Sequence, residues 1–266
     1  MSAITSAIRQ SIRPSIRSSF GGTPDQLQAL ITSLFSAGEQ GAFHIPRPVV
    51  NGAQVLFQDD AGTVAVTADG DPVGLMLDQS GNGNHATQTV SGSRPVYRTD
   101  GTLHWLETDG VDDSFVYPTS TTSTSHTVAV AHSPDGISGD LEYFLDADGS
   151  GRLIFAHLTA TGGKIGIFDG AWREPGNAAL GAQVVTYDAN GSQSDLGIYR
   201  NNLLIGTRLA YSPVAISPPS RLMLRFSDNK NSYAGKIYGI VIVHNTISTS
   251  QRGDLNSYLE GLGGVE

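Results

Sequence analysis

Two tight turns between residues 77 and 113 constrain the fold of this chain more than any other feature. The first, Asp78–Ala86, has the sequence DQSGNGNHA, and the second, Asp109–Asp113, has the sequence DGVDD. Asp and Asn favour such turns because their side chains hydrogen-bond to the nearby backbone, and Gly supplies the positive φ angles. Short apolar runs flank both turns, so we expect brief strands that reverse direction sharply.

Composition extends this pattern to most of the chain. The 266 residues include 32 Gly and 12 Pro, and only 15% are charged. Many turn formers between Thr-, Val-, Ile- and Tyr-rich runs favour an all-β fold, and the length suffices for a large core. We therefore predict a two-sheet antiparallel jelly-roll sandwich from about residue 40. The candidate strands are 55–57, 73–77, 103–107, 127–131, 141–145, 152–157, 164–168, 183–187, 196–200, 203–208, 221–226 and 236–243.

Two helices are predicted by their end signals. Residues 23–26, Thr-Pro-Asp-Gln, form a capping box with Pro at the first helical position. An apolar stripe with helical spacing follows and ends at Gly38, so its face must pack on the main domain or on a neighbouring copy. A second capping box, Ser248 with Gln251, begins a short closing helix.

Residues 1–22 have a pattern of their own. Apolar side chains recur every four residues, at Ile4, Ile8, Ile12, Ile16 and Phe20. On a helix this stripe would drift by about 40° per step, whereas an extended chain keeps it on one face. The opposite face carries three cations and the segment has no acid: Arg9, Arg13 and Arg17. Two interpretations stay open, an arm that attaches to a partner, which we favour, and an unstructured tail.

Composition also excludes several classes of protein. The chain has no Cys, so disulfide scaffolds and thiolate chemistry are ruled out. A net charge of −9 argues against a nucleic-acid-binding protein. No apolar run reaches the roughly 18 residues that span a bilayer, and the N-terminus lacks the apolar stretch of a signal peptide. We expect a soluble protein that does not insert into a membrane.

Three groups of segments share their pattern with a known family. They are 34–41 (LFSAGEQG) with 56–64 and 71–74; 78–86 with Arg94-Pro95 and 109–113; and 233–242 with 248–259. Together these segments resemble the concanavalin A-like, laminin-G-like jelly roll of bacteriophage virion proteins. The resemblance implies two stacked antiparallel sheets on a tail or head appendage, where such domains bind glycans or serve as structural modules.

The two turns are also the best candidates for a metal site. They offer side-chain oxygens at Asp78, Asn82, Asn84, Asp112 and Asp113. Ca²⁺ takes six to eight oxygen ligands, which such a cluster supplies in part. Turn building explains the same residues without a metal, and we favour that interpretation, so no cofactor is expected.

Catalytic motifs are missing from the sequence. Residues 146–151 begin like an EF-hand loop, but His157 stands where the bidentate acid is required. Glu142 and Asp146 share one face of a predicted strand at about 13 Å, which is too far apart for a glycosidase pair. No Ser nucleophile elbow, zinc-binding HExxH or phosphate loop occurs. We therefore expect a protein that is not an enzyme.

The segment 168–177 is the best candidate for glycan binding. It has the sequence FDGAWREPGN, and we expect a loop that presents a large aromatic residue among polar ones. The candidate contact residues are Trp172, Arg173, Glu174 and Asn177. The other tryptophan, Trp105, alternates like a strand residue and is expected in the core. A packing or interface role for Trp172 stays open.

These observations predict three regions: an attachment arm at 1–22, an amphipathic helix at 23–38 and a jelly-roll domain at 39–266. We expect a non-enzymatic fibre or spike component of a phage-like virion, a homo-oligomer held to other virion proteins by its arm. The jelly roll would present a surface to host polysaccharide. The alternatives are a glycan depolymerase on the same fold and a free carbohydrate-binding module.

Overall fold

The computed structural model describes residues 23–118, 122–136, 141–148, 153–158, 164–177, 179–206, 208–223 and 232–265. The proposed arm lies outside these residues, together with its eight candidate attachment residues, Ile4, Ile8, Arg9, Ile12, Arg13, Ile16, Arg17 and Phe20.

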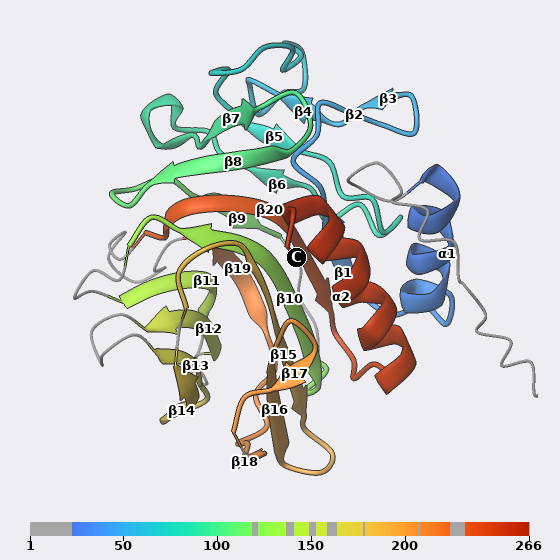
Figure 1. Ribbon diagram of the computed structural model, residues 1–266, viewed down its shortest axis with the longest axis vertical. Coiled ribbons are helices and arrows are strands. Elements are labelled where there is room, and N and C mark those ends of the chain that lie inside the picture. Colours follow the sequence, from blue (N-terminus) through green and yellow to red (C-terminus); the bar gives the residue numbers. More distant parts are fainter. Residues whose placement is uncertain are drawn as a thin grey trace, which may run out of the picture.

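Within the described residues, two antiparallel nine-stranded sheets form a sandwich (Figure 1). The first sheet has the order β17-β16-β15-β10-β20-β8-β7, with β1 beside β20 and β18 beside β16; the second has the order β14-β13-β12-β11-β19-β9-β6-β5-β4. The first contains β1 (Gly41–His44), β7 (Val96–Thr99), β8 (His104–Asp109), β10 (His126–Pro134), β15 (Gln183–Asn190), β16 (Asp195–Arg200), β17 (Leu203–Leu204), β18 (Leu209–Ala210) and β20 (Ala234–Val243). The second contains β4 (Leu56–Phe57), β5 (Leu75–Met76), β6 (Ala86–Thr87), β9 (Phe115–Tyr117), β11 (Leu141–Asp148), β12 (Leu153–Leu158), β13 (Lys164–Phe168), β14 (Trp172–Asn177) and β19 (Ser217–Leu222). A small ribbon, β2 (Val49–Val50) with β3 (Ala53–Gln54), and a 3₁₀ turn at Ser91–Ser93 complete the elements. The predicted all-β sandwich is confirmed.

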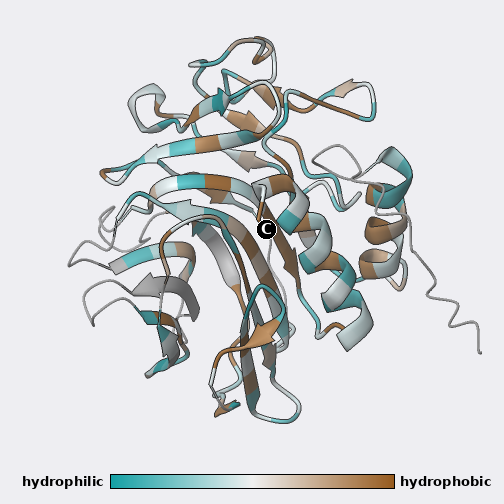
Figure 2. Ribbon diagram, in the orientation of Figure 1, coloured by the Kyte–Doolittle hydropathy of each residue, from teal (hydrophilic) through white to brown (hydrophobic). Residues whose placement is uncertain are grey.

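The core lies between the two sheets. Strand residues alternate between two faces, and residues directly opposite on neighbouring strands share a face. Phe115, Leu222 and Leu145 are opposite one another across three strands of the second sheet and are completely buried. In Figure 2, hydrophobic segments (brown) run along β10 and β20. These strands are buried on both faces because helix α2 covers the side away from the second sheet.

Both helices begin at the predicted capping boxes. Helix α1 (Pro24–Phe35) is capped by Thr23 and helix α2 (Thr249–Gly263) by Ser248. Helix α2 packs on β10, β15 and β20, and α1 packs on α2 (Figure 1). The buried Leu residues of α1 belong to the same core cluster as the sheets, so its apolar face is satisfied within this chain. Among the described residues, neither helix is long and apolar enough to cross a membrane.

The turn at Asp78 fastens strand β1 to the sandwich. The Asp78 carboxylate accepts hydrogen bonds from the backbone N–H groups of Phe43 (2.8 Å), Ser80 (2.8 Å) and Asn84 (3.0 Å). The amide groups of Asn82 and Asn84 donate to the carbonyl of Gly41 at 3.2 Å and 2.7 Å. Each of these side chains is therefore engaged by backbone groups, as expected of residues that build a turn.

Candidate functional site

The candidate site lies on the outer face of β13, which the alternation of side chains along that strand defines. Ile165 and Ile167 are completely buried in the core. Lys164 and Phe168 therefore lie on the opposite face of the second sheet, where both are partly exposed. The neighbouring strand β14 continues this face, because Phe168 is opposite Trp172 and Lys164 is opposite Asn177. We call these four residues the β13–β14 surface.

The predicted loop at 168–177 is wrong in its second half, where Trp172–Asn177 forms β14. The chain reverses at Asp169–Ala171, where Gly170 has a φ of +101° and the Asp169 N–H donates to the Ala171 carbonyl (3.3 Å). Strand β14 lies at the edge of its sheet and contains one extra residue, opposite the Ile165–Ile167 stretch. An edge strand with a bulge tolerates Pro175, which has no N–H to donate.

Trp172 and Phe168 form an aromatic pair on this surface. Their ring centroids are 5.4 Å apart and the ring planes are inclined by 65°. Edge-to-face packing of this kind holds both rings while part of each stays accessible. The pair is thus a firm apolar platform at the turn end of the hairpin.

Arg173 and Glu174 do not belong to that platform. Arg173 is opposite the core residue Ile167 and pairs with the buried Asp169 carboxylate at 3.3 Å. That carboxylate also accepts the backbone N–H of Ser212 at 2.7 Å, so the pair holds the edge of one sheet to the end of the other. Glu174 is half-buried at the bulge. The register places Trp172 and Asn177 on one face and Arg173 on the core side, and it leaves Glu174 in the bulge without a partner position.

Asn177 connects the far end of the surface to the first sheet. Its side-chain oxygen accepts a hydrogen bond from the Lys164 Nζ (2.7 Å), and its backbone carbonyl accepts one from Arg200 Nη1 (3.0 Å). Next to it, a Cβ on Gly176 would overlap the side chain of Ile205. Glycine at 176 therefore lets the two sheet edges meet. Sequence reasoning missed Lys164, Phe168 and Arg200, because only the strand register shows which residues stand beside Trp172 and Asn177.

The same face continues toward the middle of the second sheet. Backbone register places Arg221, Asp146, Ile154, Phe168 and Trp172 in one row across five strands. Asp146 is fully buried there, and Arg221 donates to the Ser114 hydroxyl at 3.5 Å.

Glu142 lies on the other face of β11, in the row of the core residue Ile165. A bulge between Tyr143 and Leu145 adds one residue and reverses the alternation. The predicted shared face of Glu142 and Asp146 is therefore wrong.

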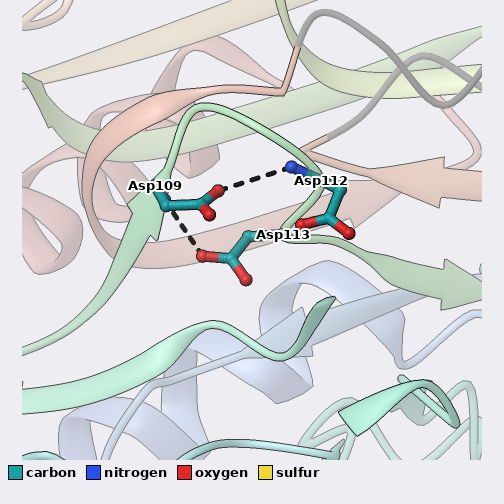
Figure 3. A group of neighbouring side chains, drawn as sticks. All are labelled: Asp109, Asp112 and Asp113. Atoms are coloured by element: carbon teal, nitrogen blue, oxygen red, sulfur yellow. Dashed lines mark hydrogen bonds between the residues drawn. The ribbon is translucent and has the colours of Figure 1, made fainter. Parts of the chain in front are cut away.

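A compact carboxylate cluster forms at the second predicted turn (Figure 3). Asp109, Asp112 and Asp113 offer oxygen atoms that all lie within 4.8 Å of one another. The Asp109 carboxylate accepts the N–H of Asp112 (3.4 Å), and the Asp113 carboxylate accepts the N–H of Asp109 (3.0 Å). Burial, more than its acidic neighbours, raises the pKa of Asp113 to about 6. The cluster adds Asp109 to the predicted pair Asp112 and Asp113, whereas the Asp78 carboxylate is engaged by backbone N–H groups at its own turn.

A chain of buried aromatic groups crosses the sandwich near β10 and β20. His126 Nε2 lies 2.8 Å from the Val214 carbonyl, its Nδ1 lies 3.3 Å from His244 Nδ1, and His244 Nε2 lies 3.4 Å from the Tyr117 hydroxyl. A carbonyl only accepts, so each proton position follows: Tyr117 donates to His244, His244 to His126, and His126 to Val214. This order requires both rings to be neutral. Burial agrees with it, lowering the pKa of His126 to about 4 and of His244 to about 3.

Comparison with known proteins identifies the fold. No protein-family profile matches the sequence, and no curated protein is significantly similar to it. Among solved structures, domain 4 of AbnA, a GH43 extracellular arabinanase from Geobacillus stearothermophilus in complex with arabinotriose, matches at TM-score 0.53 and 14% identity, over 67% of this chain and 91% of that one. A Trypanosoma rangeli sialidase matches at TM-score 0.53 and 13% identity, over 89% of this chain and 38% of that one. A GH54 α-L-arabinofuranosidase matches at TM-score 0.61 and 13% identity, over 88% and 65%.

The chain thus spans less than two thirds of the sialidase and of the arabinofuranosidase. At 13 to 14% identity these similarities show the fold alone. They place the chain in the class of β-sandwich folds found in carbohydrate-binding and glycan-processing proteins. These comparisons support neither the concanavalin A-like subclass nor a link to bacteriophages.

The expectation that the chain is not an enzyme, which rests on missing catalytic motifs, is contradicted by these comparisons. The structures that share the fold are those of an arabinanase domain, a sialidase and an arabinofuranosidase. Glycoside hydrolases use this fold, so the missing motifs do not exclude hydrolysis.

Proposed function

We propose that this chain is a carbohydrate-binding β-sandwich and that the β13–β14 surface is where sugar binds. The observation that carries the proposal is the aromatic pair Phe168–Trp172, which is fixed by its own ring contact and partly exposed at a sheet edge. An aromatic ring offers a flat apolar face against the C–H face of a sugar ring, and its rigidity keeps the entropy cost of binding small. Asn177 supplies hydrogen-bonding groups on the same face.

The fold supports the same proposal. The arabinanase domain that shares the fold was solved in complex with arabinotriose. Fold alone does not fix function, so the proposal depends on the surface rather than on this likeness.

Calorimetric titration tests the site directly, because its signal does not depend on either of the two Trp residues. The full chain is titrated with soluble polysaccharides of differing composition, and Trp172→Ala is compared with Trp105→Phe. Trp105 lies on β8, beside Tyr238 and beneath Lys236. We expect Trp172→Ala to weaken binding by at least about tenfold, whereas Trp105→Phe binds like the parent. Equal affinity of the parent and Trp172→Ala would overturn the proposed site.

The same mixtures are assayed for newly formed reducing ends. Binding without release identifies a carbohydrate-binding module, and release identifies a depolymerase. The sequence-based alternatives are thereby separated in one experiment.

We also propose that residues 1–22 attach the chain to a virion. The alternating Ile and Arg side chains of that segment are the observation that supports this role. A chain lacking residues 1–22 is expected to keep its circular dichroism spectrum and glycan binding but to lose assembly with its partner. Unchanged assembly of the truncated chain contradicts the attachment role.

A further inference from the structure

We infer that the glycan bound on the β13–β14 surface is acidic, with an anionic group that lies between Lys164 and Arg200. This inference rests on the proposed function and adds the chemical class of the ligand. It starts from the contacts of Asn177, to which both cations donate, one at the side chain and one at the backbone carbonyl.

The two cations lack an acidic partner in the part of the chain that the structure describes. Their contacts there are with the neutral oxygens of Asn177. Other Arg residues differ: Arg173 pairs with Asp169, Arg98 with Glu107, and Arg208 with Asp195. In a chain of net charge −9, these two cations both donate to one neutral residue.

Other charged groups nearby do not cancel this local charge. On β13 and β14, the acid is Glu174, which lies at the bulge and forms no ion pair with either cation among the described residues. The Asp169 carboxylate is buried and committed to Arg173 and Ser212. An oxyanion of the ligand is therefore the group that best satisfies Lys164 and Arg200, through charge-assisted hydrogen bonds.

The aromatic and cationic ends are separated along the strand. Lys164 and Phe168 are four residues apart along β13, or about 13 Å at the rise of a β-strand. This length suits an oligosaccharide better than a single ring. One sugar would pack on Trp172 and Phe168 while an acidic sugar farther along reaches Lys164 and Arg200.

The experiment compares three polymers with the full chain: a polyuronate, the same polyuronate after reduction of its carboxyl groups, and a sulfated neutral polysaccharide. We expect the polyuronate to bind roughly tenfold more tightly than its reduced form at low salt, and to lose that advantage as salt rises. Comparable binding of the sulfated polymer shows that any oxyanion suffices, and weaker binding assigns the site to carboxylates. Equal binding of the native and reduced polymers overturns the inference and leaves the proposed function standing. Absence of binding to every polymer, neutral ones included, overturns both.

Matched variants locate the charge effect. Lys164→Gln and Arg200→Gln each remove one positive charge while keeping a hydrogen-bond donor, and each is expected to remove most of the preference for the native polyuronate. Lys236→Gln makes the same change in net charge on β20, over the Trp105 ring, and is expected to leave the preference intact. Arg200→Lys is expected to restore part of it. A preference that survives in both Gln variants, or falls equally in Lys236→Gln, contradicts the assignment.

Discussion

The Asp78 turn and the β13–β14 surface differ in what their side chains contact. In the turn, the carboxylate and amide groups of Asp78, Asn82 and Asn84 bind the protein's own backbone. On the β13–β14 surface, Trp172 and Phe168 remain partly exposed and Lys164 donates to a neutral amide oxygen. Polar residues in a tight turn are thus a poor guide to ligand binding when the turn itself satisfies them. Partly exposed side chains whose hydrogen-bonding or charge partners are incomplete are a better guide to ligand binding.

Acid should destabilise the core of the sandwich strongly while it leaves binding at the β13–β14 surface almost unchanged. Burial lowers the pKa of His44 to about 4, of His126 to about 4 and of His244 to about 3. The unfolded chain therefore takes up protons first, and stability is lost as pH falls from about 6.5 toward 4. At pH 5 each histidine costs about 2 kcal/mol relative to pH 7. Urea unfolding at both pH values checks this. Glycan binding by the folded chain should change little, because the β13–β14 surface has no histidine.

Replacing Asp78 should have the next largest effect. Asp78→Ala leaves the N–H groups of Phe43, Ser80 and Asn84 without their acceptor. We expect a loss of about 3–5 kcal/mol in the free energy of unfolding, since each unpaired buried donor costs about 1–3 kcal/mol. Trp172→Ala should cost much less stability while it weakens glycan binding. If the two substitutions destabilise equally, the distinction between a structural turn and a presented surface is lost.

Asp113→Asn should act in the opposite direction. The pKa of Asp113 is raised to about 6, so its charge opposes folding as pH rises through that value. We expect the amide to stabilise the protein at pH 7 by about 1–2 kcal/mol and to have little effect at pH 4.5. Thermal unfolding with and without Ca²⁺ also tests whether the three carboxylates bind a metal ion. A bound ion would raise the Tm of the parent more than that of Asp113→Asn. Equal shifts leave the three carboxylates as turn residues only.

Glu174→Gln should have the smallest effect. Glu174 is half-buried at the bulge of β14. We expect a change of less than about 0.5 kcal/mol in stability and a small increase in affinity for an acidic polymer, because one negative charge leaves the neighbourhood of Lys164. Calorimetric titration of Glu174→Gln, in parallel with Lys164→Gln, measures the change in affinity. Weaker binding by Glu174→Gln would show that Glu174 itself contacts the sugar.

The sequence by itself determined the features that depend on neighbours a few residues apart. These are the capping boxes at Thr23 and Ser248, the alternation that makes strands, and the turn at Asp78. They are predictable because a hydrogen bond from a side chain to the next few backbone groups depends on little else. The hairpin turn at Asn201–Asn202, with φ angles of 47° and 62°, follows the same rule.

Tertiary structure alone decided which side chains share a face. The bulge in β11 separates Glu142 from Asp146, and the register of β13 with β14 separates Trp172 from Arg173. A single inserted residue reverses every position beyond it, and sequence patterns do not reveal where that residue lies. Arg200 reaches Asn177 only because the edges of two sheets meet. The turn at Asp78 was therefore predictable from the sequence, whereas the surface that we propose to bind sugar exists only once the strands are paired.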